Sequence, residues 1–255
     1  MSRYKVPSLE KTLAIIEALA EMDEPAGVSE LCKMLDIPKT SAFFILNTLE
    51  QHQYVTKTED GKYRLGARFI SIGNSVLSKI DIRNVAKPFM QELLKETDFT
   101  VHLAVLDNFE AMYVEKVENH AFVKFSTFIG QRLPLHASGV GKALAAHMPE
   151  ADLETYLREH GLPAKTENTI TSPKEFRMAL ETIRNTGYAI EDEEGEYGIR
   201  CIGAPILGHD GKLIAAISVT ALRTELPVQE IPTIGEKVKA TALKISEQMG
   251  YRPQP

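Results

Sequence analysis

The sequence has few of the features that mark secreted, membrane or fibrous proteins. Its 255 residues include no tryptophan and only two cysteines, Cys32 and Cys201, so far apart that a disulfide framework is not expected. No stretch approaches the ~18–20 apolar residues of a membrane span, and the first residues lead into a polar segment without a signal-peptide core. We therefore expect a cytoplasmic protein with no membrane partner.

An excess of positive charge is also missing. The 29 Lys and Arg residues against 35 Asp and Glu residues give a net charge of −6, and residues 1–65 hold 8 basic and 10 acidic side chains. This balance argues against a strongly basic nucleic-acid binder, although a local DNA-reading surface remains compatible with it. The hydrophobic share of 44% and charged share of 25% are those of an ordinary globular protein.

The N-terminal part is predicted to be helical. Apolar residues recur at helical spacing over 9–22, 28–35 and 39–53, with Pro, Gly and Asp in the intervening breaks. Ser8 is the expected N-cap of the first helix. The predicted buried stripe of that helix is Leu9, Leu13, Ile16 and Ala20.

A hairpin is predicted directly after the third helix. Residues 54–57 and 62–65 are β-rich and flank the turn pair Asp60-Gly61. Helix, helix, turn, helix and hairpin is the order of a winged helix-turn-helix, whose recognition helix enters the major groove of DNA. We assign this domain to residues 1–66 and a connecting amphipathic helix to residues 67–80.

From residue 81 the pattern changes to strands mixed with helices, which predicts an α+β domain over 81–255. Ser172, Pro173 and Glu175 form a capping-box pattern with proline at its preferred position. The predicted helices are 82–96, 139–147, 150–160, 173–186 and 234–249, and the predicted strands are 101–106, 111–117, 122–127, 201–207 and 213–220.

The third helix has a candidate DNA-reading face. With Ala42 at the centre of the buried stripe, 100° per residue places polar residues and Phe44 on the opposite side. A solvated face explains the polar residues but not a bare Phe at its centre, whereas Asn and Gln can read adenine and Phe or Thr can touch thymine methyls. The predicted set on this helix is Lys39, Thr40, Ser41, Phe43, Phe44, Asn47, Thr48 and Gln51.

Phosphate contacts are assigned to the hairpin, where Lys57, Lys62 and Arg64 are the candidate partners. Solvated hairpin charge explains these three residues equally well. Lys39 is the only basic residue of the third helix, so few phosphate contacts and a modest non-specific affinity are expected.

No catalytic residue, metal site or cofactor is predicted. Residues 139–142 superficially resemble a phosphate-binding loop, but the first glycine and the Ser/Thr after Lys142 are missing. His136 and Ser138 lack a nucleophile elbow and a third partner, and the seven histidines lack metal-ligand spacing. His102 is interpreted as a core histidine. Residues 138–140 instead indicate a loop entering a helix, whose free N–H groups can bind a carboxylate.

Ordered motifs along nearly the whole chain resemble the IclR family of transcriptional regulators. The motifs are residues 35–41, 49–50, 54–55, 63–66, 101–106, 113–117, 132–143, 187–188, 192–194, 198–201, 204–206 and 216–219. The resemblance implies a winged helix-turn-helix joined by a linker helix to a GAF-like mixed α/β effector domain. It further implies a homodimer or homotetramer that binds a double-stranded DNA operator, and of the two regulatory outcomes we expect repression.

The resemblance also implies a site for a small organic acid in the second domain. Isoleucines 202, 206 and 217 and Val219 are expected to provide its apolar setting. Glu191 and Thr220 stand where many relatives have Asp and Ser, and Phe44 stands where family members typically have Arg. The resemblance places the side-chain contacts to the effector at Glu191, Cys201, Ser218 and Thr220. With the helix start at Ser138, Gly139 and Val140, these are the predicted effector-binding residues.

Two alternatives to an effector-responsive regulator stay open. The acidic N-terminal segment and Phe44 favour a small-molecule sensor whose DNA binding is weakened or lost. A small-molecule-transforming enzyme with a vestigial helical domain would need a nucleophile, a metal or an acid/base pair, and none is found in the sequence.

Overall fold

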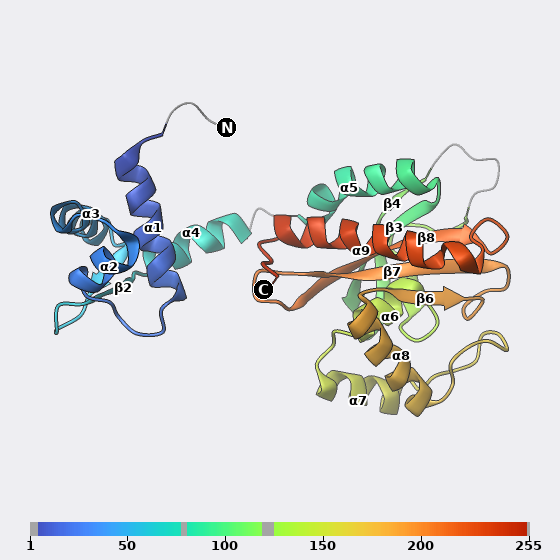
Figure 1. Ribbon diagram of the computed structural model, residues 1–255. Coiled ribbons are helices and arrows are strands. Elements are labelled where there is room, and N and C mark those ends of the chain that lie inside the picture. The colour runs from blue at the N-terminus through green and yellow to red at the C-terminus, as the bar shows by residue number, and fades with distance from the viewer. Residues whose placement is uncertain (1–4, 78–80, 119–124, 254–255) are drawn as a thin grey trace. The chain divides into compact units, whose positions relative to one another are not determined.

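The computed structural model describes residues 5–77, 81–118 and 125–253 (Figure 1). The chain divides into two compact units, Met1–Ile80 and Asp81–Pro255, and each has its own core.

The first unit is a helical bundle followed by a small hairpin, in the predicted order. The core gathers the inner faces of the first three helices and the hairpin, with Leu31, Ala42 and Leu46 fully buried. The elements are α1 (Pro7–Glu21), α2 (Val28–Leu35), α3 (Lys39–Gln51), β1 (Val55–Lys57), β2 (Tyr63–Leu65) and α4 (Arg68–Leu77).

The predicted start and buried stripe of α1 are wrong. The helix begins at Pro7 after Val6, and Ser8 lies inside the first turn, where its carbonyl accepts a hydrogen bond from Thr12. Leu9 and Leu13 are about half exposed. Only the C-terminal half of α1 packs on the core, so the buried residues follow that contact and not the leucine spacing. They are Ile15, Ala18 and Leu19.

The hairpin is short and one-sided. β1 and β2 pair antiparallel with Val55 opposite Leu65 and Lys57 opposite Tyr63. Val55 and Tyr63 are buried and their neighbours Thr56 and Arg64 are exposed, which is the alternation expected of a strand pair with one covered face.

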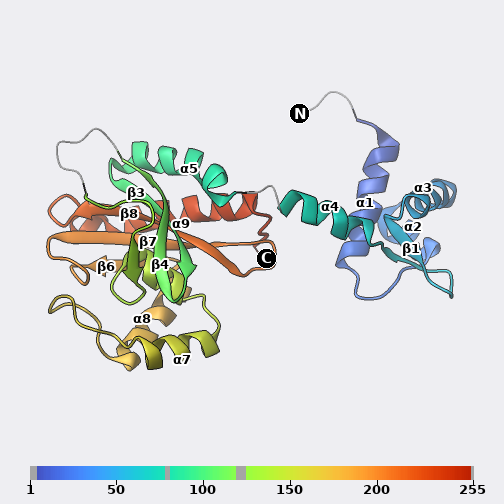
Figure 2. The same cartoon turned by 180° about the vertical axis from the view of Figure 1, so that it is seen from behind.

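The second unit is built on one antiparallel sheet of six strands in the order β5-β4-β3-β8-β7-β6 (Figure 2). Its strands are β3 (Thr100–Asp107), β4 (Glu110–Val117), β5 (Arg132–Pro134), β6 (Ala189–Asp192), β7 (Ile199–Leu207) and β8 (Leu213–Leu222). Its helices are α5 (Ile82–Thr97), α6 (Gly139–Ala145), α7 (Glu150–Glu159), α8 (Pro173–Thr186) and α9 (Ile231–Gln248), with a 3₁₀ turn η1 (Val228–Glu230).

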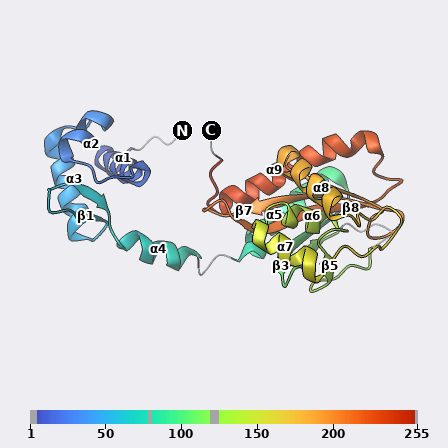
Figure 3. The same cartoon turned by 90° about the horizontal axis from the view of Figure 1, so that it is seen from below.

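Each face of this sheet has its own layer of helices. α5 and α9 cover one face, where Leu103, Ile202 and Val219 are buried. α6 and α8, with α7 packed beside them, lie on the other face around Ala104 and Tyr113 (Figure 3). A helical N-terminal unit and a sheet unit of this kind confirm the predicted α+β class.

Several predicted elements differ from the structure. Residues 125–127 form no strand, and the rest of the predicted strand 122–127 lies outside the described residues. β5 and β6 were not predicted, because each is a short edge strand and neither has an extended apolar run. The predicted cap at Ser172 is confirmed, since its hydroxyl accepts the Glu175 N–H.

Candidate functional site

α3 presents its polar residues and two phenylalanines on one exposed face. Ala42, Leu46 and Leu49 pack into the core, and the opposite side carries Phe43 and Phe44 with 51% and 65% of their surface exposed. Of the predicted residues on α3, Ser41 alone is partly covered. The exposed ones are Lys39, Thr40, Phe43, Phe44, Asn47, Thr48 and Gln51.

Three of these side chains are engaged within the helix. The Thr48 hydroxyl donates to the Phe44 carbonyl at 2.9 Å, so its methyl group is the part left to face a groove. The Phe43 and Phe44 rings meet edge to face with centroids 6.0 Å apart. The Asn47 amide has no hydrogen-bond partner in the described part of the chain.

The three hairpin cations differ in their surroundings. Lys62 lies 3.6 Å from Asp60, and the Lys57 ammonium stands 5.6 Å from the Tyr63 ring centroid. Arg64 is exposed and has no ion pair among the residues that the structure describes. Arg64 is therefore the hairpin cation that would give up the fewest existing contacts on binding a phosphate.

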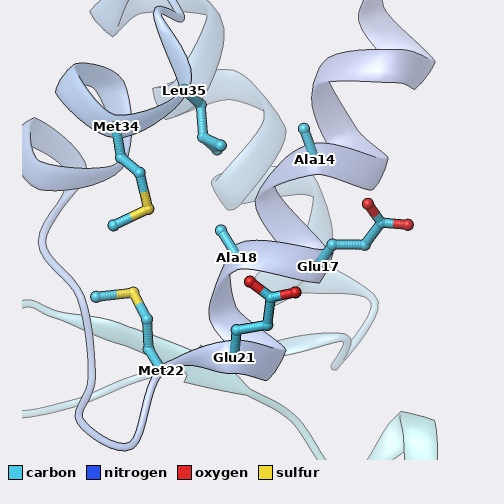
Figure 4. Close-up of a pocket in the computed structure, with 7 residues that line it drawn as sticks. All are labelled: Ala14, Glu17, Ala18, Glu21, Met22, Met34 and Leu35. Carbon is cyan, nitrogen blue, oxygen red and sulfur yellow. The ribbon is translucent and has the colours of Figure 1, made fainter. Parts of the chain in front are cut away.

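A separate hollow of about 510 Å³ lies between α1 and α2 in the first unit (Figure 4). Alanines, methionines and two carboxylates, Glu17 and Glu21, line it. None of the predicted site residues belongs to this hollow.

The second unit contains a cavity of about 500 Å³ on the α6 side of its sheet. The seven predicted effector-site residues come from the start of α6 and from three different strands, and all of them line this one cavity. They are Ser138, Gly139, Val140, Glu191, Cys201, Ser218 and Thr220.

Strand register explains how residues distant in sequence meet on the cavity floor. Glu191 on β6 pairs with Cys201 on β7, and Cys201 pairs with Thr220 on β8. Ser218, two residues before Thr220, points to the same side of the sheet. The Glu191 carboxyl, the Cys201 thiol and the hydroxyls of Ser218 and Thr220 therefore form one continuous polar surface on the cavity floor.

The start of α6 approaches this floor closely because glycines stand at both sides of the contact. A Cβ on Gly203 would lie 2.4 Å from the Gly139 carbonyl oxygen, and one on Gly139 would lie 3.0 Å from the Cys201 Cβ. The Ser138 hydroxyl caps the helix by accepting the Gly141 N–H, and it donates to the Pro134 carbonyl. The amides of Gly139 and Val140, the first of the helix, have no intrahelical acceptor.

Glu191 is the buried acid of the cavity. Its Oε1 accepts the N–H groups of Glu194 and Gly195 at 2.8 and 3.0 Å. Burial raises the pKa of the Glu191 carboxyl above its usual range, while these two donors act in the opposite direction. A ligand hydroxyl that donates to this group would be well placed.

Cys201 is a poor nucleophile in this setting. Burial and the neighbouring Glu191 raise the pKa of the Cys201 thiol well above its usual value, and its Sγ lies 3.4 Å from the Thr220 Oγ1. The thiol therefore contributes a weak polar contact and not a thiolate.

His102 is buried, as its strand position indicates, but it also lies directly behind the cavity. Its Nε2 is 2.8 Å from the Thr127 Oγ1 and its Nδ1 is 3.3 Å from the Thr220 Oγ1. Burial lowers the pKa of His102 to about 3, so the imidazole is neutral at physiological pH. Both threonines line the cavity.

A buried ion pair holds the rim beside the cavity. The Lys142 ammonium on α6 bonds to the Glu194 carboxylate, and the two side chains are only 3% and 11% exposed. The hydroxyls of Thr166 and Thr169 hydrogen-bond to the loop that carries Glu194. The Thr169 hydroxyl donates to the Glu194 carbonyl at 2.6 Å. Lys142 is thus a structural residue here and not a phosphate ligand.

The expected apolar setting of the cavity is wrong. Ile202, Ile206, Ile217 and Val219 belong to the core under α5 and α9, on the opposite face of the sheet. Strand alternation places them there, because Ser218 and Thr220 face the other way. The apolar wall comes instead from Phe125, Leu133, Ile199 and Leu222.

Sequence reasoning missed several polar residues of the cavity. Tyr113 and Arg132 lie within the family-like motifs, but nothing in their local pattern marks them as lining residues. Arg132 pairs with Asp107 and Glu110, so its charge is already matched. The other missed polar residues are Ser126, Thr127, Gln131, Lys165 and Glu196.

Catalytic machinery is not evident in the described ranges. His136 is occupied at both ring nitrogens, by the Tyr156 hydroxyl at 2.8 Å and the Pro163 carbonyl at 3.0 Å. Among residues 5–77, 81–118 and 125–253, no cluster of three His, Cys, Asp or Glu side chains is placed to hold a metal, and no helix is long and apolar enough to cross a membrane.

Comparison with known domain families decides the relationship. Residues 8–59 match the IclR helix-turn-helix domain, and residues 74–247 match the domain described as bacterial transcriptional regulator IclR C-terminal. The chain belongs to the IclR family. This membership confirms the resemblance read from the sequence motifs.

IclR-family relatives match the chain over almost its full length. The HTH-type transcriptional regulator XynR of Escherichia coli K12 is 34% identical over 96% of this chain and 98% of its own. The transcriptional repressor AllR of Klebsiella pneumoniae is 32% identical over 97% and 91%. The crystal structure of the Agobacterium tumefaciens repressor BlcR superposes with a TM-score of 0.82 at 27% identity, covering 96% and 98%.

These IclR-family relatives are regulators and not enzymes. With its matching helix-turn-helix domain, the protein is a DNA-binding transcriptional regulator.

Proposed function

We propose that the protein is an effector-responsive repressor, with a small organic acid as its effector and residues 138–140, Glu191, Cys201, Ser218 and Thr220 as the effector site. The convergence of these residues on one cavity of about 500 Å³ carries the proposal. Cavities of this size with a few convergent polar groups are typical small-ligand sites.

The ligand carboxylate is assigned to the amides at the start of α6. Gly139 and Val140 lack intrahelical acceptors, and the glycine at 139 lets a ligand approach the backbone. Arg132 and the nearby Lys142 already have carboxylate partners. Lys165, which also lines the cavity, is exposed, so it and the backbone donors are left to recognise the anion. Glu191 then accepts from a ligand hydroxyl or hydrate, because an ionised acid facing a bound carboxylate would be unfavourable.

DNA recognition is assigned to the exposed face of α3. Asn47, Gln51 and Thr40 supply hydrogen-bonding groups, and Phe44 supplies an apolar surface for thymine methyls. Lys57, Lys62 and Arg64 of the hairpin supply phosphate contacts. We further propose the division into residues 1–66, 67–80 and 81–255, with a homodimer or homotetramer presenting two recognition helices to a pseudo-palindromic operator.

The effector acts by binding two arrangements of the protein with different affinities. It can shift the equilibrium between them only by that difference. The linker helix is the element that connects the cavity-bearing unit to the DNA-reading unit. The repressor outcome is supported by the names of AllR and BlcR, which are repressors.

Selection of bound DNA from a random pool, with and without candidate acids, tests this function. We expect a recovered two-fold-symmetric site and a loss of its enrichment when the effector is present. The second candidate, a sensor without DNA binding, is favoured by Phe44 in place of a cation and by the acidic balance of residues 1–65. Recovery of no site from the pool, together with tight binding of an acid, would establish that candidate instead.

A further inference from the structure

Two side chains that are neighbours across the sheet hold one wall of the cavity. His102 on β3 and Lys116 on β4 are register partners, and Ser218 on β8 is the partner of His102 on its other side. Residues 125–127 lie outside any helix or strand and line the cavity. Both His102 and Lys116 reach across to this segment.

Lys116 binds the backbone of the segment. Its ammonium donates to the carbonyls of Phe125 and Thr127 at 2.9 and 3.0 Å and also lies 2.7 Å from a Glu118 carboxylate oxygen. The side chain is only 13% exposed. Carbonyl groups outside a ladder need donors from elsewhere, and Lys116 supplies two of them at once.

His102 binds the side chain of the same segment and joins it to the floor. Its two ring nitrogens contact the Thr127 hydroxyl on the wall and the Thr220 hydroxyl on β8. Its ring stacks on Tyr113 with centroids 4.3 Å apart, which fixes the plane of the imidazole. His102 has no exposed surface, and the two threonine hydroxyls are its hydrogen-bond partners in the described structure.

A neutral imidazole has one nitrogen that donates and one that accepts. One of the two threonine hydroxyls therefore accepts from His102 and keeps its proton for another acceptor, which is a ligand or, in the case of Thr220, also the Cys201 sulfur. The other donates to His102 and presents only lone pairs to the cavity. This hydroxyl and the Glu191 carboxylate are then hydrogen-bond acceptors that face the cavity. An ionised oxo acid carries acceptors only, so it cannot donate a hydrogen bond to either of them.

Building on the effector site proposed above, we propose that His102 and Lys116 are positioning residues that hold residues 125–127 as the outer wall of the cavity. By orienting the hydroxyls of Thr127 and Thr220, they make the site select a carboxylic acid that carries at least one hydroxyl group. The corresponding oxo acid binds more weakly, because a buried polar group left without a partner is costly.

The wall is tested first, without ligand, in the full-length protein. Hydrogen exchange of the amides of residues 125–131 is compared among wild type, Lys116→Met and Thr127→Val. We expect at least tenfold faster exchange in Lys116→Met, recovery in Lys116→Arg, and a smaller increase in Thr127→Val. Lys87→Met is the matched control. Lys87 lies on α5, and its ammonium pairs with Glu115 of β4 and not with the wall. Unchanged exchange in Lys116→Met would overturn the proposal that Lys116 holds the wall.

Selectivity is then tested by calorimetric titration of matched pairs, lactate with pyruvate, malate with oxaloacetate, and gluconate with 2-oxogluconate. We expect the hydroxy member of the best pair to bind wild type at least tenfold tighter and this ratio to fall toward one in His102→Gln and Thr127→Val. Thr127→Val keeps the test valid if His102→Gln does not fold. Tighter binding of oxo acids would overturn the selectivity. Binding of no acid, with the exchange result intact, would overturn the proposed effector function and leave the wall assignment standing.

Discussion

Cys201 and Thr220 face each other across β7 and β8, with the thiol sulfur and the hydroxyl oxygen 3.4 Å apart. Glu191 continues the same row on β6 as the partner of Cys201. This row and the first amides of α6 form one polar corner of the cavity, so a change at any of these side chains alters the same polar surface.

Removing a polar group from the cavity should weaken effector binding. Ser218→Ala removes a neutral hydrogen bond, worth about 0.5–1.5 kcal/mol, and Glu191→Gln removes a charged acceptor, worth about 1.5–3 kcal/mol. Both variants should keep the effector-free operator affinity. Calorimetric titration of small hydroxy and oxo acids measures the loss of effector affinity. Glu247→Gln is the control, because Glu247 is exposed on α9. An acid that binds tightly and equally to all of these variants would place the site elsewhere.

Asn47→Ala should weaken binding to the selected operator by about 1–3 kcal/mol, the usual loss for one good base contact. Folding should be unaffected, because Asn47 is exposed. A mobility-shift titration gives the affinity, with Asn84→Ala, an exposed position on α5, as the matched control. An unchanged affinity would remove Asn47 from the reading face.

Operator affinity should depend only moderately on salt. Lys39, Lys57, Lys62 and Arg64 suggest on the order of four to six phosphate contacts per dimer, which corresponds to a slope of log affinity against log salt of about −4 to −5. Fluorescence anisotropy at several salt concentrations measures this slope. A slope that corresponds to about ten phosphate contacts would mean that a further basic surface takes part.

The Lys142–Glu194 pair should be costly to break but not to replace. Lys142→Met leaves a buried carboxylate without its partner and should lower the free energy of unfolding by about 3–5 kcal/mol. The double variant Lys142→Met/Glu194→Leu should recover most of that loss. Urea unfolding followed by circular dichroism provides the values, since the chain has no tryptophan. A double variant as unstable as the sum of the two single variants would contradict this account.

Acid should destabilise the second unit through His102. Its folded pKa of about 3 lies below the unfolded value of 6.5, so the unfolded state takes up the proton first as pH falls. The stabilisation is complete above pH 6.5 and is lost toward pH 3, amounting to roughly 3 kcal/mol by pH 4. Unfolding curves of wild type and His102→Gln from pH 7 to 4 should converge. Curves that remain parallel would contradict a neutral buried His102.

Local patterns were sufficient for most elements but not for the surfaces between them. The helices, the hairpin and the Ser172 cap were predictable because spacing and capping are local properties. The buried side of α1 was not, since packing on the core at Ile15 and Leu19 overrides the leucine spacing. β5 and β6 were missed because edge pairing depends on a partner strand that the local sequence does not reveal.

The cavity was only partly predictable for the same reason. Its seven predicted residues came from the helix-start pattern at 138–140 and from the family resemblance, whereas Thr127 and Lys165 lie in irregular segments of the structure. The isoleucines assigned to its wall lie on the opposite face of the sheet, because consecutive strand residues such as Ile217 and Ser218 point to opposite sides.

The central claim is that occupancy of the cavity changes the affinity of the full-length protein for its operator. The direct measurement is operator affinity with and without the acid that binds most tightly, in wild type and in Glu191→Gln. A coupling of about 1–3 kcal/mol, seen as a 5- to 150-fold loss of affinity in wild type, is expected. In Glu191→Gln the same loss should require a higher acid concentration. An operator affinity that stays constant while the cavity is saturated with acid would contradict the account.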